Sequence, residues 1–316
     1  MESNLNLEEI CNRYKVDKVL DIKPQSSGHV NDTYIVKTAE CDYVLQRVQK
    51  GMHISHLEHN YSLYSEVLDK CGLVYPKWMK DCDGKHFYID QETDAWRMYP
   101  YIESDMTKEP LSGEMLYAYG EGIAKMHAAF REIDGEVEPV YPHLHDLAFY
   151  LQKHRRLITS DSSQKSFRDS ELEKQIELLG ERFGDISEEC QDIIHSDTKL
   201  SNVLFKEGQV LGFIDFDTIT KGPVTIDIAD AIRSCCIKDG KLDKEAADCL
   251  INGYTDLCDA GIAEEVKNNL QRDFEKICFE LALRYYIDAI SGENYFKDKE
   301  PAYKLERAKS LIESII

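Results

Sequence analysis

The chain has 316 residues, of which 42% are hydrophobic and 31% charged, and its net charge is −21 at pH 7. This length is more than one hydrophobic core usually organises, and it suits a protein of two lobes. The negative charge works against binding to nucleic acid or to an anionic membrane, because their phosphates require Lys and Arg as partners. We therefore expect neither as a partner.

The sequence also argues against membrane, exported and zinc-binding proteins. It has no apolar run of about 18 residues that would span a bilayer, and its first residues lack the features of a signal peptide. Its ten cysteines are scattered and form no C-x-x-C spacing, which argues against a zinc site. We expect a cytoplasmic protein with free thiols and no obligate protein partner.

The first hundred residues are predicted to form strands with one inserted helix. Apolar residues recur at helical spacing over residues 54–70, and Gly72 is the expected C-cap. A hairpin is expected over 78–90, with its turn at Asp83 and Gly84. Period-two alternation and turn residues predict the other strands at 17–24, 29–37, 41–50 and 95–103.

The remaining residues are mainly helical by pattern. Long helices are expected at 113–133, 143–157 and 170–183, and again from about residue 225 onward. Short apolar strands and polar turns interrupt this pattern at 192–219. The outline is that of an α+β, two-lobed, protein-kinase-like fold. We expect a β-rich nucleotide-binding lobe over residues 1–102 and a helical lobe with the catalytic loop and the substrate site over 103–316.

The most informative stretch reads H-S-D-T-K-L-S-N from residue 195, followed by I-D-F-D ending at residue 217. Asp197 and Asn202 have the spacing of the catalytic loop H-R-D-x-x-x-x-N, in which the Asp orients the attacking hydroxyl and the Asn holds magnesium. Lys199 would offset charge on the transferred group. Asp215 follows an apolar strand in the context of the metal-binding Asp-Phe step, and Asp217 stands where a glycine would follow.

Nearby polar residues have structural interpretations. Asp227 is expected to anchor the catalytic loop by accepting hydrogen bonds from its backbone. His195 is expected to pack the loop, because Asp197 already supplies a base. The spacing of His53, His56 and His59 is that of solvated positions on a helix, with no Cys or acidic partner to complete a metal site.

The stretches HSDTKLSNVLF, GFIDFDT and DIADAIR resemble the aminoglycoside phosphotransferase-like kinase superfamily, which includes choline, homoserine and fructosamine kinases. Within it, the wording is most similar to the N-acetylhexosamine 1-kinases. GHVNDTYIV, YVLQRVQ, WRMYPYIE and RYYIDAISGENYFK extend this resemblance from about Gly28 to the last helices. Ser196 departs from it, because those kinases usually have Asn there.

The resemblance implies a role for residues that spacing alone leaves open. Asp197 would be the catalytic base, with Lys199 beside the transferred group. The magnesium ligands would be Asn202 and Asp215, with Asp217 near the metal or the sugar. The sugar site would include Asp32, Arg284 and Tyr295, and the connector from Met98 through Tyr99 to Tyr101 would bind adenine through its backbone.

The phosphate-binding part of the small lobe departs from the usual kinase pattern. The loop around Gly28 has a single glycine, and no Walker motif occurs in the chain. The strand YVLQRV has no lysine, so Gln46 or Arg47 is expected to take its place, on opposite faces of the strand. Arg47 paired with Glu58 is the favoured replacement for the usual Lys–Glu pair.

These features predict an ATP- and Mg²⁺-dependent kinase of a small molecule. The favoured acceptor is the anomeric hydroxyl of an N-acetylhexosamine, as the resemblance implies. A kinase of a cationic acceptor, of the aminoglycoside or choline type, is the alternative, which the negative net charge permits. A non-catalytic nucleotide-binding protein is disfavoured, because Asp197, Asn202 and Asp215 are all present.

Overall fold

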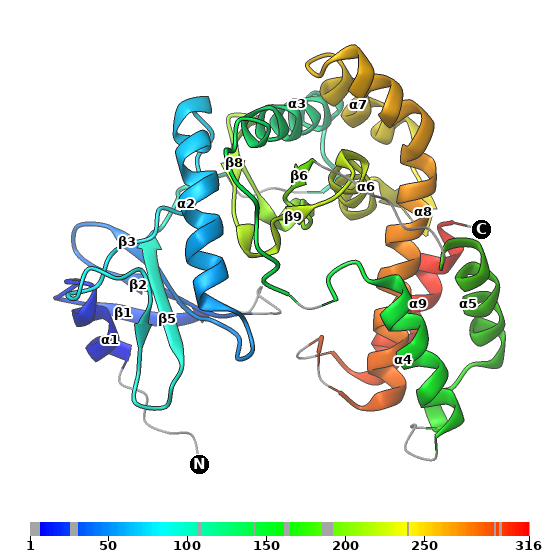
Figure 1. Cartoon of the computed structure of the whole chain (residues 1–316), viewed down its shortest axis with the longest axis horizontal. Coiled ribbons are helices and arrows are strands. Elements are labelled where there is room, and N and C mark those ends of the chain that lie inside the picture. Colours follow the sequence, from blue (N-terminus) through cyan, green and yellow to red (C-terminus); the bar gives the residue numbers. More distant parts are fainter. Residues whose placement is uncertain are drawn as a thin grey trace.

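A five-stranded antiparallel sheet forms the small lobe of the computed structural model, with the strand order β1-β2-β3-β5-β4 (Figure 1). Side chains alternate between its two faces. One face, with Leu45 and Met98, packs under α1 (Leu7–Arg13), and the other, with Val44 and Tyr99, packs toward α2 (Ile54–Cys71). The strands are β1 (Asp21–Gln25), β2 (Asp32–Lys37), β3 (Asp42–Arg47), β4 (Tyr88–Ile89) and β5 (Ala95–Pro100).

The helix α2 lies between the five-stranded sheet and the large lobe (Figure 1), and its prediction is confirmed. It ends at Gly72, whose φ of 79° is the left-handed conformation expected of a C-cap glycine. The chain then pairs with the large lobe, because Val74 donates its N–H to Leu211 and its carbonyl accepts from Phe213. A Cβ on Gly212 would lie 1.8 Å from the carbonyl oxygen of Val74, so this close backbone approach requires glycine.

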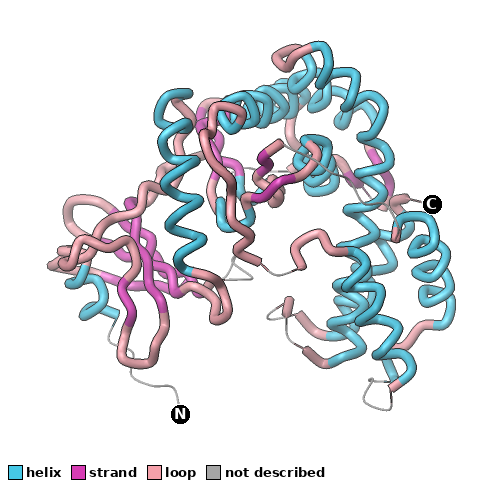
Figure 2. The backbone as a smooth tube through the Cα atoms, viewed as in Figure 1, coloured by secondary structure: helices cyan, strands magenta, loops and turns pink. Residues whose placement is uncertain are grey.

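The large lobe is mostly helical, and Figure 2 shows its helices gathered in one half of the molecule and the five-stranded sheet in the other. Short antiparallel pairs, β6 with β9 and β7 with β8, carry the catalytic stretch. The strands are β6 (Ile193–Ile194), β7 (Val203–Lys206), β8 (Gln209–Phe213), β9 (Thr220–Lys221), β10 (Ile237–Lys238) and β11 (Lys241–Leu242). The helices are α3 (Gly113–Phe130), α4 (Leu147–Thr159), α5 (Ser170–Phe183), α6 (Val224–Cys235), α7 (Lys244–Thr255), α8 (Ala260–Ser291) and α9 (Pro301–Glu313).

The predicted hairpin over 78–90 is wrong. The turn at Gly84 forms, with a φ of 78°, but the paired strands are β4 and β5, which join farther along the chain. Asp90 stabilises the turn between β4 and β5, because its carboxylate accepts the backbone N–H groups of Glu92 and Asp94.

The structure describes residues 7–25, 31–105, 109–141, 143–160, 165–184, 192–238, 240–293, 295–296 and 299–315. The cysteines in these ranges carry free thiols. None of the helices in the described ranges combines the length and the apolar character that crossing a membrane requires.

Candidate active site

The catalytic loop begins directly after β6 and is anchored by α6. The carboxylate of Asp227 accepts the backbone N–H groups of His195, at 2.8 Å, and of Ser196, at 2.7 Å. It also lies 2.8 Å from Nε2 of His127. The buried ring of His195 contacts the carbonyl oxygen of Ile214 at 3.0 Å. The predicted structural roles of Asp227 and His195 are confirmed by these contacts.

Asp197 is held through a single carboxylate oxygen. Its Oδ2 lies 2.5 Å from Nζ of Lys199 and 2.9 Å from Nδ2 of Asn202. Among the described residues, no hydrogen bond to its Oδ1 is present, so this oxygen remains to accept a proton or a hydroxyl group. Burial alone would raise the pKa of Asp197, but the adjacent ammonium of Lys199 outweighs burial and lowers that pKa. The carboxylate is therefore ionised, as a base must be.

Asp215 follows β8 in a left-handed conformation, with φ 67° and ψ 52°. Burial and the neighbouring charge of Asp217 raise its pKa to about 7. A buried carboxylate in this setting is stabilised by a cation.

Asp215 and Asn202 line one cavity and offer the hard oxygen ligands that Mg²⁺ prefers. Within the described ranges, no group of three or more His, Cys, Asp or Glu side chains could hold a metal alone. The two oxygen donors Asp215 and Asn202 fit a magnesium ion that would also be bound by substrate phosphates.

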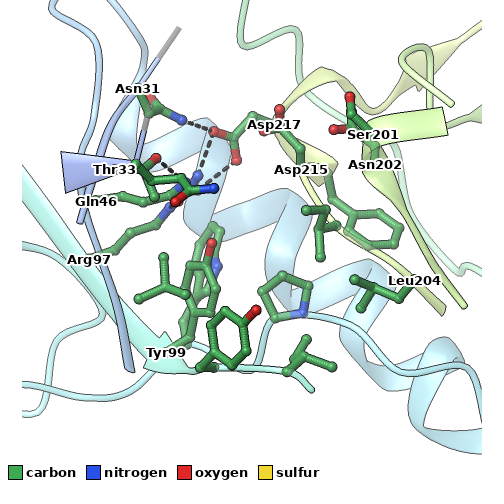
Figure 3. A pocket seen from close by; sticks show the side chains of 18 of the residues that line it. Asn31, Thr33, Gln46, Arg97, Tyr99, Ser201, Asn202, Leu204, Asp215 and Asp217 are labelled. Atoms are coloured by element: carbon green, nitrogen blue, oxygen red, sulfur yellow. Dashed lines mark hydrogen bonds and ion pairs between the residues drawn. The ribbon is translucent and has the colours of Figure 1, made fainter. Parts of the chain in front are cut away.

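Asp217, which was predicted to lie near the metal or the sugar, lines the same cavity as Asp215, and its carboxylate is bound by the small lobe. Arg97 donates two hydrogen bonds to this carboxylate, of 2.6 and 2.7 Å, and Nδ2 of Asn31 donates a third, of 3.0 Å (Figure 3). Arg97 also donates from Nε to Gln46 at 2.9 Å, and Gln46 donates to Thr33 at 3.1 Å. Sequence reasoning missed Arg97. Its signal was the β3–β5 register, which places it opposite Gln46.

The predicted Arg47–Glu58 pair is wrong. Arg47 lies on the other face of the sheet, over the ring of Trp96, where it binds Asp32 at 2.5 Å and Asp94 at 3.3 Å. Glu58 lies 3.9 Å from a ring nitrogen of His86. Strand alternation separates Arg47 from Gln46, which lines the cavity, so only one of the two expected residues faces the nucleotide side.

Asp32 is held in the ion pair with Arg47. Its carboxylate binds Arg47, and Asp32 does not line the cavities described below. The structure therefore does not bring Asp32 together with Arg284 and Tyr295. Gly28 lies outside the described residues.

One cavity, of about 290 Å³, lies between the sheet and the catalytic loop. Tyr99 and Tyr101 line it, whereas the side chain of Met98 is buried in the core under α1. The backbone of the predicted connector is partly engaged, because the carbonyl of Met98 accepts from Met79 and the N–H of Tyr101 donates to Asp42. Apolar walls with polar groups at one end suit a nucleotide, with its phosphates toward Asn202 and Asp215.

A second cavity, of about 260 Å³, lies on the other side of the catalytic loop. Lys199 and Ser201 line both cavities. Arg284 donates to the hydroxyl of Tyr295, so these two predicted substrate residues lie together in the second cavity with Asp197. Ser196, at which the sequence departs from the kinases it resembles, also lines this cavity. Sequence reasoning assigned no role at this site to four further residues of its wall with acidic or basic side chains, which are His145, Asp230, Arg233 and Glu280.

The chain matches the model of the phosphotransferase enzyme family, APH, over residues 21–255, from β1 to the end of α7. The chain therefore belongs to the phosphotransferase enzyme family. This confirms the predicted enzyme class at the level of phosphoryl transfer.

Curated relatives share parts of the sequence. The homoserine kinase of Neisseria meningitidis serogroup B is 31% identical over 145 residues, which are 45% of this chain and 44% of that enzyme. In that match the chain spans less than half the length of its relative. The homoserine kinase of Gluconobacter oxydans is 20% identical over 251 residues, which are 78% of this chain and 77% of that enzyme.

Solved structures share the fold at low identity. A microcompartment-associated aminopropanol kinase gives a TM-score of 0.70 at 15% identity, covering 97% of this chain and 94% of that one. The amicoumacin kinase hAmiN, in complex with AMP-PNP, Ca²⁺ and Ami, gives a TM-score of 0.68 at 12% identity, covering 99% and 93%. The predicted two-lobed, kinase-like α+β fold is confirmed.

Proposed function

We propose that this phosphotransferase is an ATP- and Mg²⁺-dependent kinase that phosphorylates a hydroxyl group of a small sugar. The favoured acceptor is the anomeric hydroxyl of an N-acetylhexosamine, which would give the 1-phosphate and ADP. The observation that carries the proposal is that Lys199 and Ser201 line both cavities, so that the two cavities adjoin at the catalytic loop. A nucleotide in one cavity and an acceptor in the other would meet at Asp197.

The catalytic loop suits an in-line transfer. Asp197 would accept a hydrogen bond from the acceptor hydroxyl through Oδ1 and then receive its proton, while Lys199 offsets charge on the transferred group. Asn202 fixes the orientation of Asp197 through two hydrogen bonds. Asn202 and Asp215 would hold magnesium, which when bound supplies neutralisation of the phosphates.

The charges around the acceptor cavity support a neutral acceptor. Its three carboxylates are matched by three permanent cations, so the wall has no acidic excess to attract a cation. His145 adds to the positive side, because one ring nitrogen contacts Glu280 and the other contacts the carbonyl of Ser196. Both partners are acceptors, so both nitrogens must carry protons. The carboxylates are Asp197, Asp230 and Glu280, and the cations are Lys199, Arg233 and Arg284.

Buried polar atoms that lack a hydrogen bond on this wall support a polyhydroxylated acceptor. Within the described ranges, Oγ of Ser196, Oδ2 of Asp230 and Oε1 of Glu280 are buried without a hydrogen-bond partner. Sugar hydroxyls, which both donate and accept, would satisfy such atoms. Tyr285 and Phe296 stack at 3.7 Å between ring centroids and offer an aromatic surface beside them.

A second candidate is a kinase of an amino alcohol such as homoserine. Two curated relatives are named homoserine kinase, and a structural neighbour is named an aminopropanol kinase. An ammonium group would find acceptors at Glu280 and Asp230, and Arg284 would bind a carboxylate. This candidate replaces the aminoglycoside or choline type as the main alternative, because a wall without an excess of carboxylates offers little to a wholly cationic acceptor.

An ADP-release assay with ATP and Mg²⁺ would test the proposal. The acceptor panel would contain N-acetylglucosamine, N-acetylgalactosamine, glucose, galactose, homoserine, choline and kanamycin. We expect turnover on the acetylated hexosamines, with phosphorus NMR placing the phosphate on the anomeric oxygen. Turnover on homoserine alone would overturn the sugar assignment in favour of the second candidate, and turnover on choline or kanamycin alone would contradict both.

A further inference from the structure

The small lobe lines the proposed nucleotide cavity with a cation at a position other than the two, Gln46 and Arg47, that the sequence suggested. Two-lobed kinases carry a lysine on the third strand for phosphate binding, and the residue of β3 that faces the nucleotide cavity here is the neutral Gln46. Arg97 lies directly opposite Gln46 on β5 and lines the same cavity. It therefore brings a positive charge to the same position from the neighbouring strand.

Arg97 is held ready for a ligand. Arg97 is 2% exposed, and its guanidinium lies 4.9 Å from the ring centroid of Trp78. Three of its N–H groups donate, one to Gln46 and two to Asp217. A guanidinium has five N–H donors, and among the described residues no partner of the other two is present. Those two donors can bind phosphate oxygens without breaking the existing contacts.

The other cation of this cavity is already engaged. Among its described lining residues, the cationic side chains are Arg97 and Lys199, and Lys199 lies 2.5 Å from Asp197 on the catalytic loop. Asp217 presents both carboxylate oxygens to the small lobe and keeps Arg97 paired although it is buried. A buried guanidinium without such a counter-ion would be strongly destabilising.

We propose that Arg97 is the phosphate-binding cation of the small lobe, and that Asp217 is its counter-ion and not a magnesium ligand. This rests on the proposed function, since it assumes that a nucleotide occupies this cavity. Phosphate oxygens would bind the two free N–H groups of Arg97, while Asp215 and Asn202 remain to hold the metal.

Calorimetric titration of ATP and of adenosine, each with Mg²⁺, would test this inference. The two ligands differ only in the triphosphate, so the ratio of their Kd values reports the phosphate contribution. Because Arg97→Met alone would leave Asp217 buried without a partner, the informative variant is R97M/D217N, with folding checked by circular dichroism. We expect its Kd for ATP to rise at least about tenfold, equivalent to about 1.4 kcal/mol. The Kd for adenosine should stay within about twofold.

Two further variants control for a merely structural effect. Arg97→Lys keeps the charge and should recover part of the ATP affinity. Arg47→Met removes an arginine from the opposite face of the same sheet, where Asp94 keeps Lys50 as a partner at 2.8 Å, and should leave both Kd values unchanged.

The outcomes separate this inference from the proposed function. A double variant with the wild-type ratio of Kd values would overturn the role of Arg97 alone. A wild-type chain that binds ATP through Arg97 but phosphorylates no sugar would overturn only the sugar kinase. A wild-type chain that binds ATP no more tightly than adenosine would contradict both.

Discussion

The catalytic loop and the acceptor cavity touch each other, yet the chain assembles them in different ways. The loop is one continuous stretch, residues 195–202, fixed by hydrogen bonds to Asp227. The cavity draws its wall from that loop, from α6 and α8, and from residues near 145 and 295. The catalytic residues therefore lie within one short stretch of sequence, whereas the selection of an acceptor depends on how distant segments pack.

The two regions also differ in how their polar atoms are satisfied. In the loop, the carboxylate of Asp197 accepts hydrogen bonds from both Lys199 and Asn202. In the cavity, Ser196, Asp230 and Glu280 each keep one buried atom without a hydrogen-bond partner among the described residues. Changes in the loop should therefore slow transfer to every acceptor, whereas changes in the cavity should depend on which acceptor is used.

The largest expected effect is that of Asp197→Asn. Asparagine keeps the size of the side chain but cannot accept the proton, so we expect turnover to fall by at least about a hundredfold on every acceptor. The Kd for ATP and the melting temperature should change little. Steady-state kinetics, calorimetry and thermal unfolding would measure these three quantities.

Asp192→Asn is the matched control for that variant. Asp192 directly precedes β6, the strand that leads into the catalytic loop. It forms an ion pair with Arg131 at 3.4 Å near the surface, where such pairs contribute little to stability. We expect wild-type turnover from it. A D197N enzyme that keeps more than about a tenth of its turnover would contradict the role of Asp197 as a base.

A smaller and more selective effect is expected from Arg284→Met. The guanidinium donates to Tyr295 and lies 3.7 Å from Glu280, and its loss removes charge-assisted hydrogen bonds to the acceptor. We expect kcat/KM for the acceptor to fall by about ten- to a hundredfold. The KM for ATP should not change.

Lys267→Met, an exposed change on the same helix, should leave both values as in the wild type. Arg284→Lys should recover part of the loss if charge is what matters. Equal changes in the KM values for ATP and acceptor would argue that Arg284 supports the fold and not the cavity.

The contrast between the two regions also explains what the sequence could predict. The spacing of Asp197, Asn202 and Asp215 is a property of one continuous stretch, and these residues indeed line adjoining cavities. The helix over 54–70 followed from periodicity and from the glycine that ends it. Each of these signals lies within one short, continuous stretch of sequence.

Features that depend on pairing between distant segments were missed. Alternation correctly separated Gln46 from Arg47, but only the packing of α1 and α2 on opposite sides decides which of them faces the cavity. The position of Arg97 follows from its register with β3. His145 and Glu280 meet across 135 residues of sequence, a separation that no local pattern reports.

The smallest effect, and the sharpest distinction between the regions, is expected from Ser196→Ala. Ser196 is 3% exposed, and its hydroxyl has no hydrogen-bond partner within the described residues. Its removal takes away an unsatisfied buried group, so the melting temperature of the free enzyme should stay the same or rise. The same hydroxyl would hydrogen-bond to a bound acceptor, so kcat/KM for that acceptor should fall by about two- to tenfold.

Ser234→Ala should do the opposite. The hydroxyl of Ser234 accepts the N–H of Leu200 and donates to the carbonyl of Ala231, so its loss should lower the melting temperature. Ser234 does not line the acceptor cavity, and the preference among acceptors should therefore remain that of the wild type. If Ser196→Ala destabilises the enzyme and leaves acceptor kinetics unchanged, Ser196 belongs with the structural contacts of the loop. If Ser196→Ala instead raises the melting temperature and lowers kcat/KM for the acceptor, the hydroxyl of Ser196 contacts the acceptor. Removal of a purely structural hydroxyl could not stabilise the free enzyme and at the same time lower kcat/KM for the acceptor.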